Sequence, residues 1–379
     1  MNWKAKPLGS CIEVFDSCRR PVTKKDRVLG PYPYYGASGI VDYVDSYIFE
    51  GLHVLVAEDG ENLRSRKLPI AYLADGRFWV NNHAHVLRAN DENDTRFLSY
   101  MIESLDLSGF ITGSTQPKLS QAALLSIPLR LPKLAEQRRI AGVLGALDDK
   151  IKSNLRVRNL CRDLGGNLVA DTVRSAPSTQ LEHYAASISR GVTPQYYKDE
   201  DASPVLVLNQ KCIRDGWVTP ELARLMTPRA REKSQAIARL DDLLVNSTGQ
   251  GTLGRVARWD SDDPIYVDSH VTVVKADPRR IYPVLMPYLV FPLQDEIEHM
   301  ATGSTGQTEL SPSRLAQLNV PLLSLEEQRP LSARLVALEA QAHYCQVQSL
   351  KLTELRDALL PELMSGRMRV DEAGCLVSE

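Results

Sequence analysis

The chain has 379 residues, of which 43% are hydrophobic and 24% charged, and its formal net charge is −2. It contains no apolar run near the roughly 20 residues needed to span a bilayer, and its N-terminus lacks the apolar core of a signal peptide, so we expect a cytoplasmic protein with no membrane partner. Six scattered cysteines without a C-x-x-C pair predict neither a zinc site nor a disulfide framework. Because Lys and Arg contacts to phosphate supply most non-specific affinity for DNA, a near-zero net charge requires any DNA contact to be local or shared with a partner.

Residues 1–132 consist mostly of short β-type runs broken by Gly, Asn and Asp, with one helix expected at 95–107. This pattern predicts a mixed α/β globule. From residue 135 the apolar residues recur at steps of three and four, which predicts a long helix that ends before Pro177. Its stripe comprises Ile140, Leu144, Leu147, Ile151 and Leu155, followed by a shifted stripe of Leu160, Leu164 and Leu168.

Residues 178–322 return to the first pattern, with strand-like runs such as PVLVLNQK and YVDSHVTVVKA and a helix expected at 282–300. A second long helix follows. Its apolar residues lie on a near-heptad seam from Leu331 to Leu363, which Ser349 and Arg356 interrupt.

The second half of the chain repeats the first. The string TGSTQPKLSQAALLSIPLRLPKLAEQRRIAGVL at 112–144 returns as TGSTGQTELSPSRLAQLNVPLLSLEEQRPLSARL at 302–335, and VNNHAHVLRA at 80–89 lies over VDSHVTVVKA at 267–276, with His83 over His270. A seam of about 33 residues spans about 50 Å, which is too long for one small globule to cover. We therefore expect the two helices to pack on each other. The alternative is that each helix packs along its own globule.

These motifs resemble the specificity subunit of type I restriction-modification systems. The resemblance rests on TGSTQPKLS, an I-P-L stretch and LAEQRRIAGVLGALDDKI, on their second copies, and on the closing LLPELMSGRMRV. It implies an α+β fold class with two mixed α/β target-recognition domains, which are related by the internal repeat and separated by two long helices that form an antiparallel coiled coil. The implied boundaries are 1–132 for the first recognition domain, 133–177 for the central helix, 178–322 for the second recognition domain and 323–379 for the C-terminal helix.

The resemblance also implies a function and partners. Each recognition domain would read one half of a bipartite target in double-stranded DNA, and the helices would set the unread spacer. Two adenine methyltransferase subunits would dock on the chain, and restriction subunits would join through them. Because the two globules differ outside the shared motifs, we expect an asymmetric target.

Loops rich in Gly, Ser, Thr, Asn and Gln can bring amides to phosphates and short side chains to base edges. The twin loops are the first candidates for DNA contact, by phosphate binding or as structural caps of the next helix: Gly113, Ser114, Thr115, Gln116 and Lys118, then Gly303, Ser304, Thr305 and Gln307. Base reading requires positions that differ between the halves: Tyr34, Tyr35, Ser38, Glu58, Asp59, Asn62, Arg64 and Arg66 in the first, and Arg190, Thr193, Gln195, Tyr196, Asn209, Lys211, Ser247, Gln250, Thr252 and Arg255 in the second.

Motifs that suggest an enzyme fail on their context. Gly249, Gly251 and Gly254 form G-x-G-x-x-G, but a strand-like run follows where dinucleotide binding needs a helix N-terminus. The H-x-H pair His83 and His85 is not repeated, so we expect a strand rather than a metal site. We expect no catalytic residue, metal or cofactor. Two alternatives stay open, namely a self-contained DNA-modifying enzyme with unrecognised motifs and a coiled-coil adaptor without a DNA role.

Overall fold

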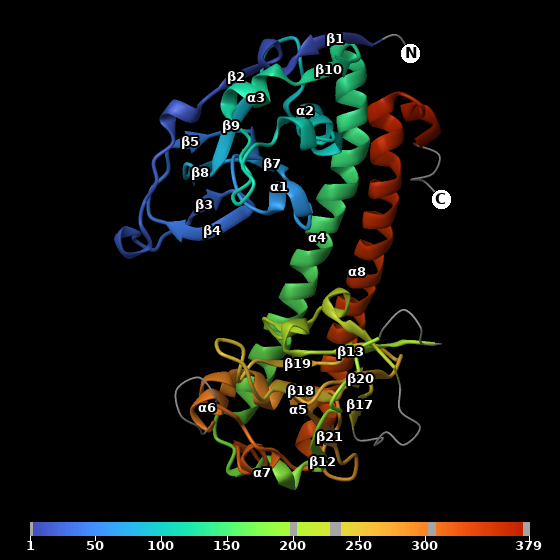
Figure 1. Cartoon of the computed structure of the whole chain (residues 1–379). Helices are drawn as coiled ribbons and strands as arrows, with labels where there is room; N and C mark the ends of the chain where they lie inside the picture. Colours follow the sequence, from blue (N-terminus) through green and yellow to red (C-terminus); the bar gives the residue numbers. More distant parts are fainter. Residues whose placement is uncertain (1–2, 198–202, 228–235, 302–307, 374–379) are drawn as a thin grey trace. The chain divides into compact units, whose positions relative to one another are not determined.

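The computed structural model describes residues 3–197, 203–227, 236–301 and 308–373 (Figure 1). Its contacts divide the chain into two compact units. Unit 1 comprises Met1–Ser153 and Gln348–Glu379, and unit 2 comprises Asn154–Val347. Within the described ranges, every helix is too short or too polar to cross a membrane. The division into four segments predicted from the sequence stays a prediction.

Unit 1 is a mixed α/β unit built on two four-stranded sheets. Its elements are β1 (Lys4–Pro7), β2 (Ile12–Val14), β3 (Tyr32–Gly36), β4 (Gly39–Val44), β5 (Phe49–Glu50), β6 (His53–Ala57), α1 (Asn62–Ser65), β7 (Ala71–Ala74), β8 (Arg77–Val80), β9 (Ala84–Ala89), α2 (Thr95–Ser104), α3 (Gln121–Ser126) and β10 (Pro128–Leu131). One sheet has the antiparallel order β2-β9-β6-β7, and the other has the order β4-β3-β8-β5 with β3 parallel to β8. Every residue of β6 is buried, as expected for an apolar run in a central strand.

Unit 2 has the same strand order. Its elements are β11 (Ser178–Gln180), β12 (Ala185–Arg190), β13 (Val205–Leu208), β14 (Ile213–Arg214), β15 (Trp217–Val218), β16 (Arg224–Met226), β17 (Ile237–Ala238), β18 (Leu243–Asn246), β19 (Val256–Arg258), β20 (Ile265–Val267), β21 (Val271–Ala276), α5 (Leu285–Val290), α6 (Gln294–His299), α7 (Pro312–Ala316) and β22 (Asn319–Pro321). Its two sheets run β12-β21-β18-β19 and β16-β13-β20-β17, with β13 parallel to β20. The register also matches, since His85 lies opposite Val56 in unit 1 and Thr272 lies opposite Val245 in unit 2.

Two helix predictions need correction. The helix expected at 95–107 ends at Ser104, and the helix expected at 282–300 is divided into α5, a 3-10 turn at Phe291–Leu293 and α6. Pro292 lies at that division. Because proline has no N–H to donate to the preceding turn, a continuous α-helix is disfavoured there.

The two long helices are α4 (Leu134–Val173) and α8 (Leu325–Ser365), and each contributes to both units. In unit 1, Ile140 and Leu144 of α4 share one hydrophobic core with Leu359 and Leu363 of α8 and with the sheet. Both helices therefore contribute side chains to the core of this unit together with the sheet, and the coiled coil expected from the sequence stays a prediction.

Arg356, which interrupts the apolar seam of α8, has a partner on α4. Its Nη1 donates to Asp148 at 2.9 Å in unit 1. A single ionic contact within an apolar seam fixes which residues of the two helices face each other, as polar residues do in coiled coils.

The shifted stripe predicted on α4 is only partly in the core. In unit 2, Leu160 and Leu164 are half exposed, whereas Arg158 and Arg162 place their guanidinium carbons 3.6 and 3.5 Å from the ring centre of Trp217. Two such contacts must lie on opposite ring faces, and the helical rise of about 6 Å over four residues allows this. Because a residue two positions away points to the opposite side of a helix, the arginine contacts turn the two leucines outward.

A buried glutamine from the duplicated E-Q-R motif joins each globule to the start of its long helix. Gln137 accepts a hydrogen bond from the Asp94 N–H at 2.9 Å and donates to the Pro132 carbonyl at 3.0 Å. Gln328 accepts from the Tyr282 N–H at 3.1 Å and donates to the Leu323 carbonyl at 2.9 Å. Both side chains are almost fully buried. The repeated motif therefore has a structural role.

A second junction lies eleven residues beyond the glutamine on each long helix, where a carboxylate of the helix accepts a hydrogen bond from a tyrosine of the sheet domain. In unit 1 the Tyr100 hydroxyl donates to Asp148, and in unit 2 the Tyr288 hydroxyl donates to Glu339 at 2.6 Å. Burial raises the pKa of both tyrosines, and the facing carboxylate raises it further. The tyrosines therefore remain protonated donors across the physiological pH range.

We predict that Gln137→Met lowers the free energy of unfolding by about 3 kcal/mol, because the Asp94 N–H and the Pro132 carbonyl lose their partner in a buried place. Methionine has a similar volume, so packing is largely kept. Urea unfolding of the full chain measures the loss, and amide hydrogen exchange at Asp94 should accelerate. Gln121→Met, at an exposed position of α3, is the control and should change stability by less than about 0.5 kcal/mol. Equal stability of the two variants would refute the junction.

Candidate nucleic-acid interface

The first of the twin loops is a short closed turn on the surface of unit 1. The backbones of Thr112 and Lys118 exchange two hydrogen bonds of 2.8 Å. Gly113 has φ +83°, and a Cβ there would lie 2.2 Å from the Gln116 carbonyl oxygen, so only glycine is accommodated. Arg64 closes the loop from outside by donating to the carbonyls of Gly113 and Ser114, the latter at 2.9 Å. The side chains of Ser114, Thr115 and Gln116 are exposed.

The corresponding residues of the second loop, Gly303, Ser304, Thr305 and Gln307, lie outside the described residues. After each loop a serine caps the next helix. Ser120 accepts from the Ala123 N–H, and Ser311 accepts from the Arg314 N–H, both at 3.2 Å. The capping function considered for this region is therefore performed by these serines, which leaves the exposed side chains of the first loop available for other contacts.

An ionic network holds the first loop to the sheet. Glu58 follows β6 and pairs with Arg19 at 2.6 Å and with Lys118 of the loop at 3.3 Å. Burial acts to raise the pKa of Glu58, but Arg19, His85 and Lys118 together hold that pKa below its ordinary value. The Glu58 carboxylate therefore stays charged and links the loop to the β-sheet.

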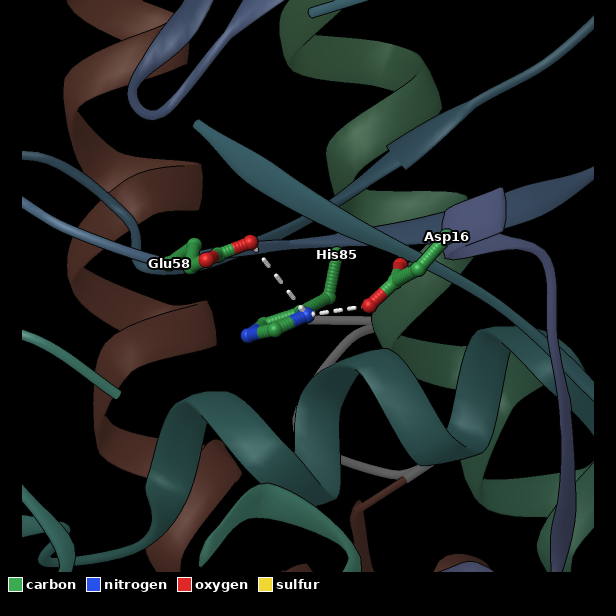
Figure 2. Close-up of side chains that lie close together, drawn as sticks. All are labelled: Asp16, Glu58 and His85. Atoms are coloured by element: carbon green, nitrogen blue, oxygen red, sulfur yellow. Dashed lines mark hydrogen bonds and ion pairs between the residues drawn. The ribbon is translucent and has the colours of Figure 1, made fainter. Parts of the chain in front are cut away.

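His85, Asp16 and Glu58 lie close enough together to suggest a metal site (Figure 2). The hydrogen bonds argue for another role. His85 Nδ1 lies 2.6 Å from an Asp16 oxygen, and Nε2 lies 2.8 Å from the Leu119 carbonyl oxygen. A carbonyl and a carboxylate both accept, so both ring nitrogens act as donors and neither has a free lone pair for a metal. Arg19 also lies 3.5 Å from Asp16. The cluster fits an ion-pair network better than a metal site.

Unit 2 holds the same backbone with the opposite arrangement of charge. Ser247 stands where Glu58 stands, because its N–H donates to the His270 carbonyl at 2.9 Å as the Glu58 N–H donates to the His83 carbonyl. The acid now lies after the second loop. Arg190 of β12 pairs with Glu309 at 2.7 Å and donates to the Leu310 carbonyl at 2.7 Å. Arg190 is therefore committed to this ion pair.

Tyr34 is wrong as a predicted base reader, because its side chain is only 1% exposed. Its hydroxyl accepts from the Val22 N–H at 2.9 Å, and the Arg27 guanidinium lies 4.4 Å from its ring centre. A ring enclosed in this way cannot reach a base. Tyr35, the next residue, is partly buried, whereas Ser38 is exposed in the turn between β3 and β4.

Asn62 and Arg66 have structural contacts that occupy their polar groups. The Asn62 amide exchanges two hydrogen bonds of 2.9 Å with the backbone of Leu68. Arg66 donates to the carbonyls of Glu103 and Leu105, at 2.7 and 2.6 Å, at the end of α2. These contacts close a loop and cap a helix, which argues against base reading by either side chain.

In unit 2, Ser247 and Asn209 are also wrong as base readers. Ser247 is fully buried and its hydroxyl lies 2.6 Å from that of Thr272. Asn209 is 8% exposed and accepts from the Lys211 N–H, which caps the 3-10 helix Gln210–Cys212. Small polar residues next to strand ends often make such local bonds, so their sequence pattern resembles that of a reading loop.

The other candidates of unit 2 differ in exposure. Thr193, Gln195, Lys211 and Gln250 are exposed. The remaining three are partly buried and engaged in local contacts: Tyr196 lies under the Arg224 guanidinium, Thr252 donates to the Gly249 carbonyl, and Arg255 donates to the Gly251 carbonyl.

The glycine motif of unit 2 has the context expected from the sequence. Gly249, Gly251 and Gly254 have φ values of +100°, +72° and +85°, and strand β19 follows them. A strand does not present the converging N–H groups of a helix N-terminus, so the motif forms a turn rather than a dinucleotide site.

Comparison with known proteins gives a family match for the first part of the chain. Residues 1–159 match the family described as the type I restriction modification DNA specificity domain. The resemblance recognised from the duplicated motifs is thereby confirmed.

Two curated relatives agree with this assignment. One is named as a type I restriction enzyme specificity subunit of Haemophilus influenzae and is 38% identical over 148 residues, covering 39% of this chain and 37% of the relative. The specificity subunit of the type I restriction enzyme EcoprrI from Escherichia coli is 26% identical over 144 residues, covering 36% of this chain and 34% of the relative. The alignments thus span little more than a third of either relative.

The fold is similar along nearly the whole chain to one solved structure. The S subunit of a type I restriction-modification system from M. genitalium superposes with a TM-score of 0.60 and 17% identity, covering 96% of each chain. This similarity concerns the fold.

The network around Glu58 generates a pH-dependent prediction. Glu58→Gln should lower the free energy of unfolding at pH 7 by about 2 kcal/mol, because Arg19 and Lys118 lose a charged partner. Since the folded pKa of Glu58 is depressed, its contribution is present above the unfolded pKa and is lost as the pH falls through the folded pKa. The difference between wild type and variant should therefore shrink below about pH 4. Chemical unfolding between pH 7 and pH 3 tests this, with the exposed Glu61→Gln as a pH-independent control.

Proposed function

We propose that this chain is the DNA sequence-recognition subunit of a type I restriction-modification complex. It reads a bipartite, asymmetric target in double-stranded DNA and acts as a scaffold for two adenine methyltransferase subunits, through which restriction subunits join. The family match of residues 1–159 and the fold similarity over the whole chain support this.

The observation that carries the proposal is one strand topology with different chemistry at matched positions. His83 of unit 1 and His270 of unit 2 occupy corresponding positions. The His83 ring lies within hydrogen-bond distance of Asp59, and the His270 ring lies within hydrogen-bond distance of Thr248. Lys118 after the first loop corresponds to Glu309 after the second, since each bridges to the residue beside its histidine. Because base edges are distinguished by donor and acceptor patterns, two readers of equal shape but different side chains suit two different half-sites.

We propose further that α4 and α8 form an antiparallel coiled coil that sets the spacer. In unit 1, Asp148 of α4 pairs with Arg356 of α8, and Arg139, which lies earlier in α4, pairs with Asp371, which lies later in the C-terminal segment. In unit 2, Val169 near the end of α4 shares a core with Leu331 and Leu335 near the start of α8. Both patterns agree with antiparallel packing.

The residues proposed to contact DNA are the predicted ones whose side chains are exposed and, apart from Lys118, are not engaged in the local contacts described above. Backbone amides, the side chains of the first twin loop and the cations would contact phosphates, and the short polar side chains at positions that differ between the halves would contact base edges. In unit 1 these are Ser38, Ser114, Thr115, Gln116 and Lys118, and in unit 2 they are Thr193, Gln195, Lys211 and Gln250.

The chemistry is assigned to the partners. An adenine methyltransferase must extrude its target base from the duplex, so a subunit that fixes the complex on the two half-sites decides which adenines are extruded. In this proposal the chain itself has no catalytic residue and needs no metal or cofactor. Adenine methylation by the purified chain alone would overturn that assignment.

An exchange of one reader tests the bipartite model. Replacing residues 1–132 by the corresponding segment of another specificity subunit should change one half of the methylated motif and leave the other half and the spacer intact. The donor segment must supply a tyrosine at the place of Tyr100, so that the junction to Asp148 forms. Genome-wide mapping of methylated adenines in the host cell gives the result. A change in both halves would show that the readers are not independent.

Lengthening the helices tests the spacer. Four residues inserted after Ser153 in α4 and four after Val347 in α8 add about one turn, or about 6 Å, to both helices and preserve their facing pairs. Because DNA rises about 34 Å per helical turn of about 10 bp, we expect the same two half-sequences with a spacer longer by one or two base pairs. Insertion in α4 alone is the matched comparison and should impair assembly, since it shifts α4 against α8. An unchanged spacer in the active double insertion would refute the model.

A further inference from the structure

Loop 20–29 of unit 1 combines exposed cations with an exposed apolar end. Residues 19–29 contain five cations and one acid. Arg20, Lys24 and Lys25 are exposed, and within the described part of the chain none of these three forms an ion pair. At the end of the loop, Val28 is 60% exposed and Leu29 is 83% exposed.

Loop 20–29 is fixed by contacts within itself and with the end of β4. The Arg27 side chain donates to the Val22 carbonyl at 3.1 Å and pairs with Asp42 of β4 at 3.0 Å. The Val28 carbonyl accepts from the Asp45 N–H at 3.0 Å. Gly30 lies so close to the end of β4 that a Cβ would be 2.3 Å from the Asp45 Cα. The backbone on both sides of Leu29 is therefore held by contacts with β4 and the residue after it, while the Leu29 side chain is exposed.

The loop begins beside the network that holds the first twin loop. Arg19 pairs with Glu58, and Glu58 pairs with Lys118 of that loop. Arg20 donates its N–H to the Val80 carbonyl, and the Trp79 indole donates to the Arg20 carbonyl at 2.6 Å. The cationic start of loop 20–29 is thus continuous with the proposed DNA-contacting surface.

We propose that loop 20–29 is a DNA-reading element in which Arg20, Lys24 and Lys25 contact phosphates and Leu29 contacts the methyl group of a thymine in the first half-site. The inference deepens the proposed function and rests on it. Apolar side chains distinguish thymine by contact with its C5-methyl group in the major groove. Exposed lysines around the apolar tip suit a polyanion, whereas the cores of protein interfaces are depleted in lysine.

The test uses the complex recovered from the host cell through a tag on the full-length chain, with duplexes carrying the mapped motif. Each thymine of the first half-site is replaced in turn by deoxyuridine, which removes only the methyl group. At one position the wild-type complex should bind about fourfold more weakly, the factor expected for one buried methyl group. A complex with Leu29→Ser should bind the thymine duplex about tenfold more weakly than wild type and should be insensitive to deoxyuridine at that same position, as a coupled pair requires.

Two further variants separate the possible outcomes. Leu68→Ser, at another half-exposed leucine of unit 1, should match wild type on every duplex. The double substitution Lys24→Gln and Lys25→Gln should lower the slope of log affinity against log salt by about 2, since each phosphate contact contributes about 0.9. Leu29→Ser should leave this slope unchanged.

The failure of this inference differs from the failure of the proposed function. If the wild-type complex binds its motif and Leu29→Ser binds equally well, or if no thymine of the half-site responds to deoxyuridine, the inference is overturned and the proposed function stands. Loss of the methyltransferase from the Leu29→Ser complex, with DNA contact by the remaining chain unaltered, would also overturn it and assign the loop to a protein partner. A wild-type complex without a preferred motif would overturn the proposed function itself.

Discussion

The organisation of each unit depends on a buried polar junction between a sheet domain and a long helix. The glutamine side-chain oxygen accepts a hydrogen bond from a backbone N–H in the segment before α2 or α5. A tyrosine hydroxyl donates a hydrogen bond to a carboxylate further along the long helix. Apolar contacts alone would leave the angle between domain and helix adjustable, because dispersion has little directional preference. Buried hydrogen bonds are directional and costly to break, so they fix that angle.

The twin surface regions show how one backbone serves two chemistries. In unit 1 an acid beside the histidine strand pairs with a lysine after the loop, and in unit 2 an arginine on the edge strand pairs with a glutamate after the loop. In each unit a side-chain nitrogen, from His85 in one and Arg190 in the other, donates to the carbonyl of the leucine before the capping serine. The shape is thus maintained by backbone hydrogen bonds and by ion pairs that differ between the two units, and the exposed positions around it are free to differ.

The sequence predicted the large features and failed at the scale of single side chains. The duplicated strings predicted matching halves and two long helices, because repeated motifs and apolar periodicity are spread over many residues. Tyr34, Asn209 and Ser247 were misassigned because a tyrosine, an asparagine or a serine looks the same in sequence whether it faces a base or satisfies a neighbouring amide. The role of Gln137 was missed for a related reason, since a glutamine in a charged stretch resembles surface, although its exact recurrence at Gln328 was a usable signal.

The stacking of Trp217 between Arg158 and Arg162 has a consequence for how such genes can recombine. On α4, Gln137, Asp148 and Asp149 contact polar groups of the unit 1 sheet domain, and Arg158 and Arg162 contact Trp217 of unit 2. A crossover within residues 150–157 passes each of these residues to a daughter gene together with the domain that it contacts. A crossover after residue 162 would separate the tryptophan from its arginines and leave two guanidinium groups without their ring. The positions of these contact residues along α4 thus define where a crossover can exchange one domain without breaking its contacts with the helix.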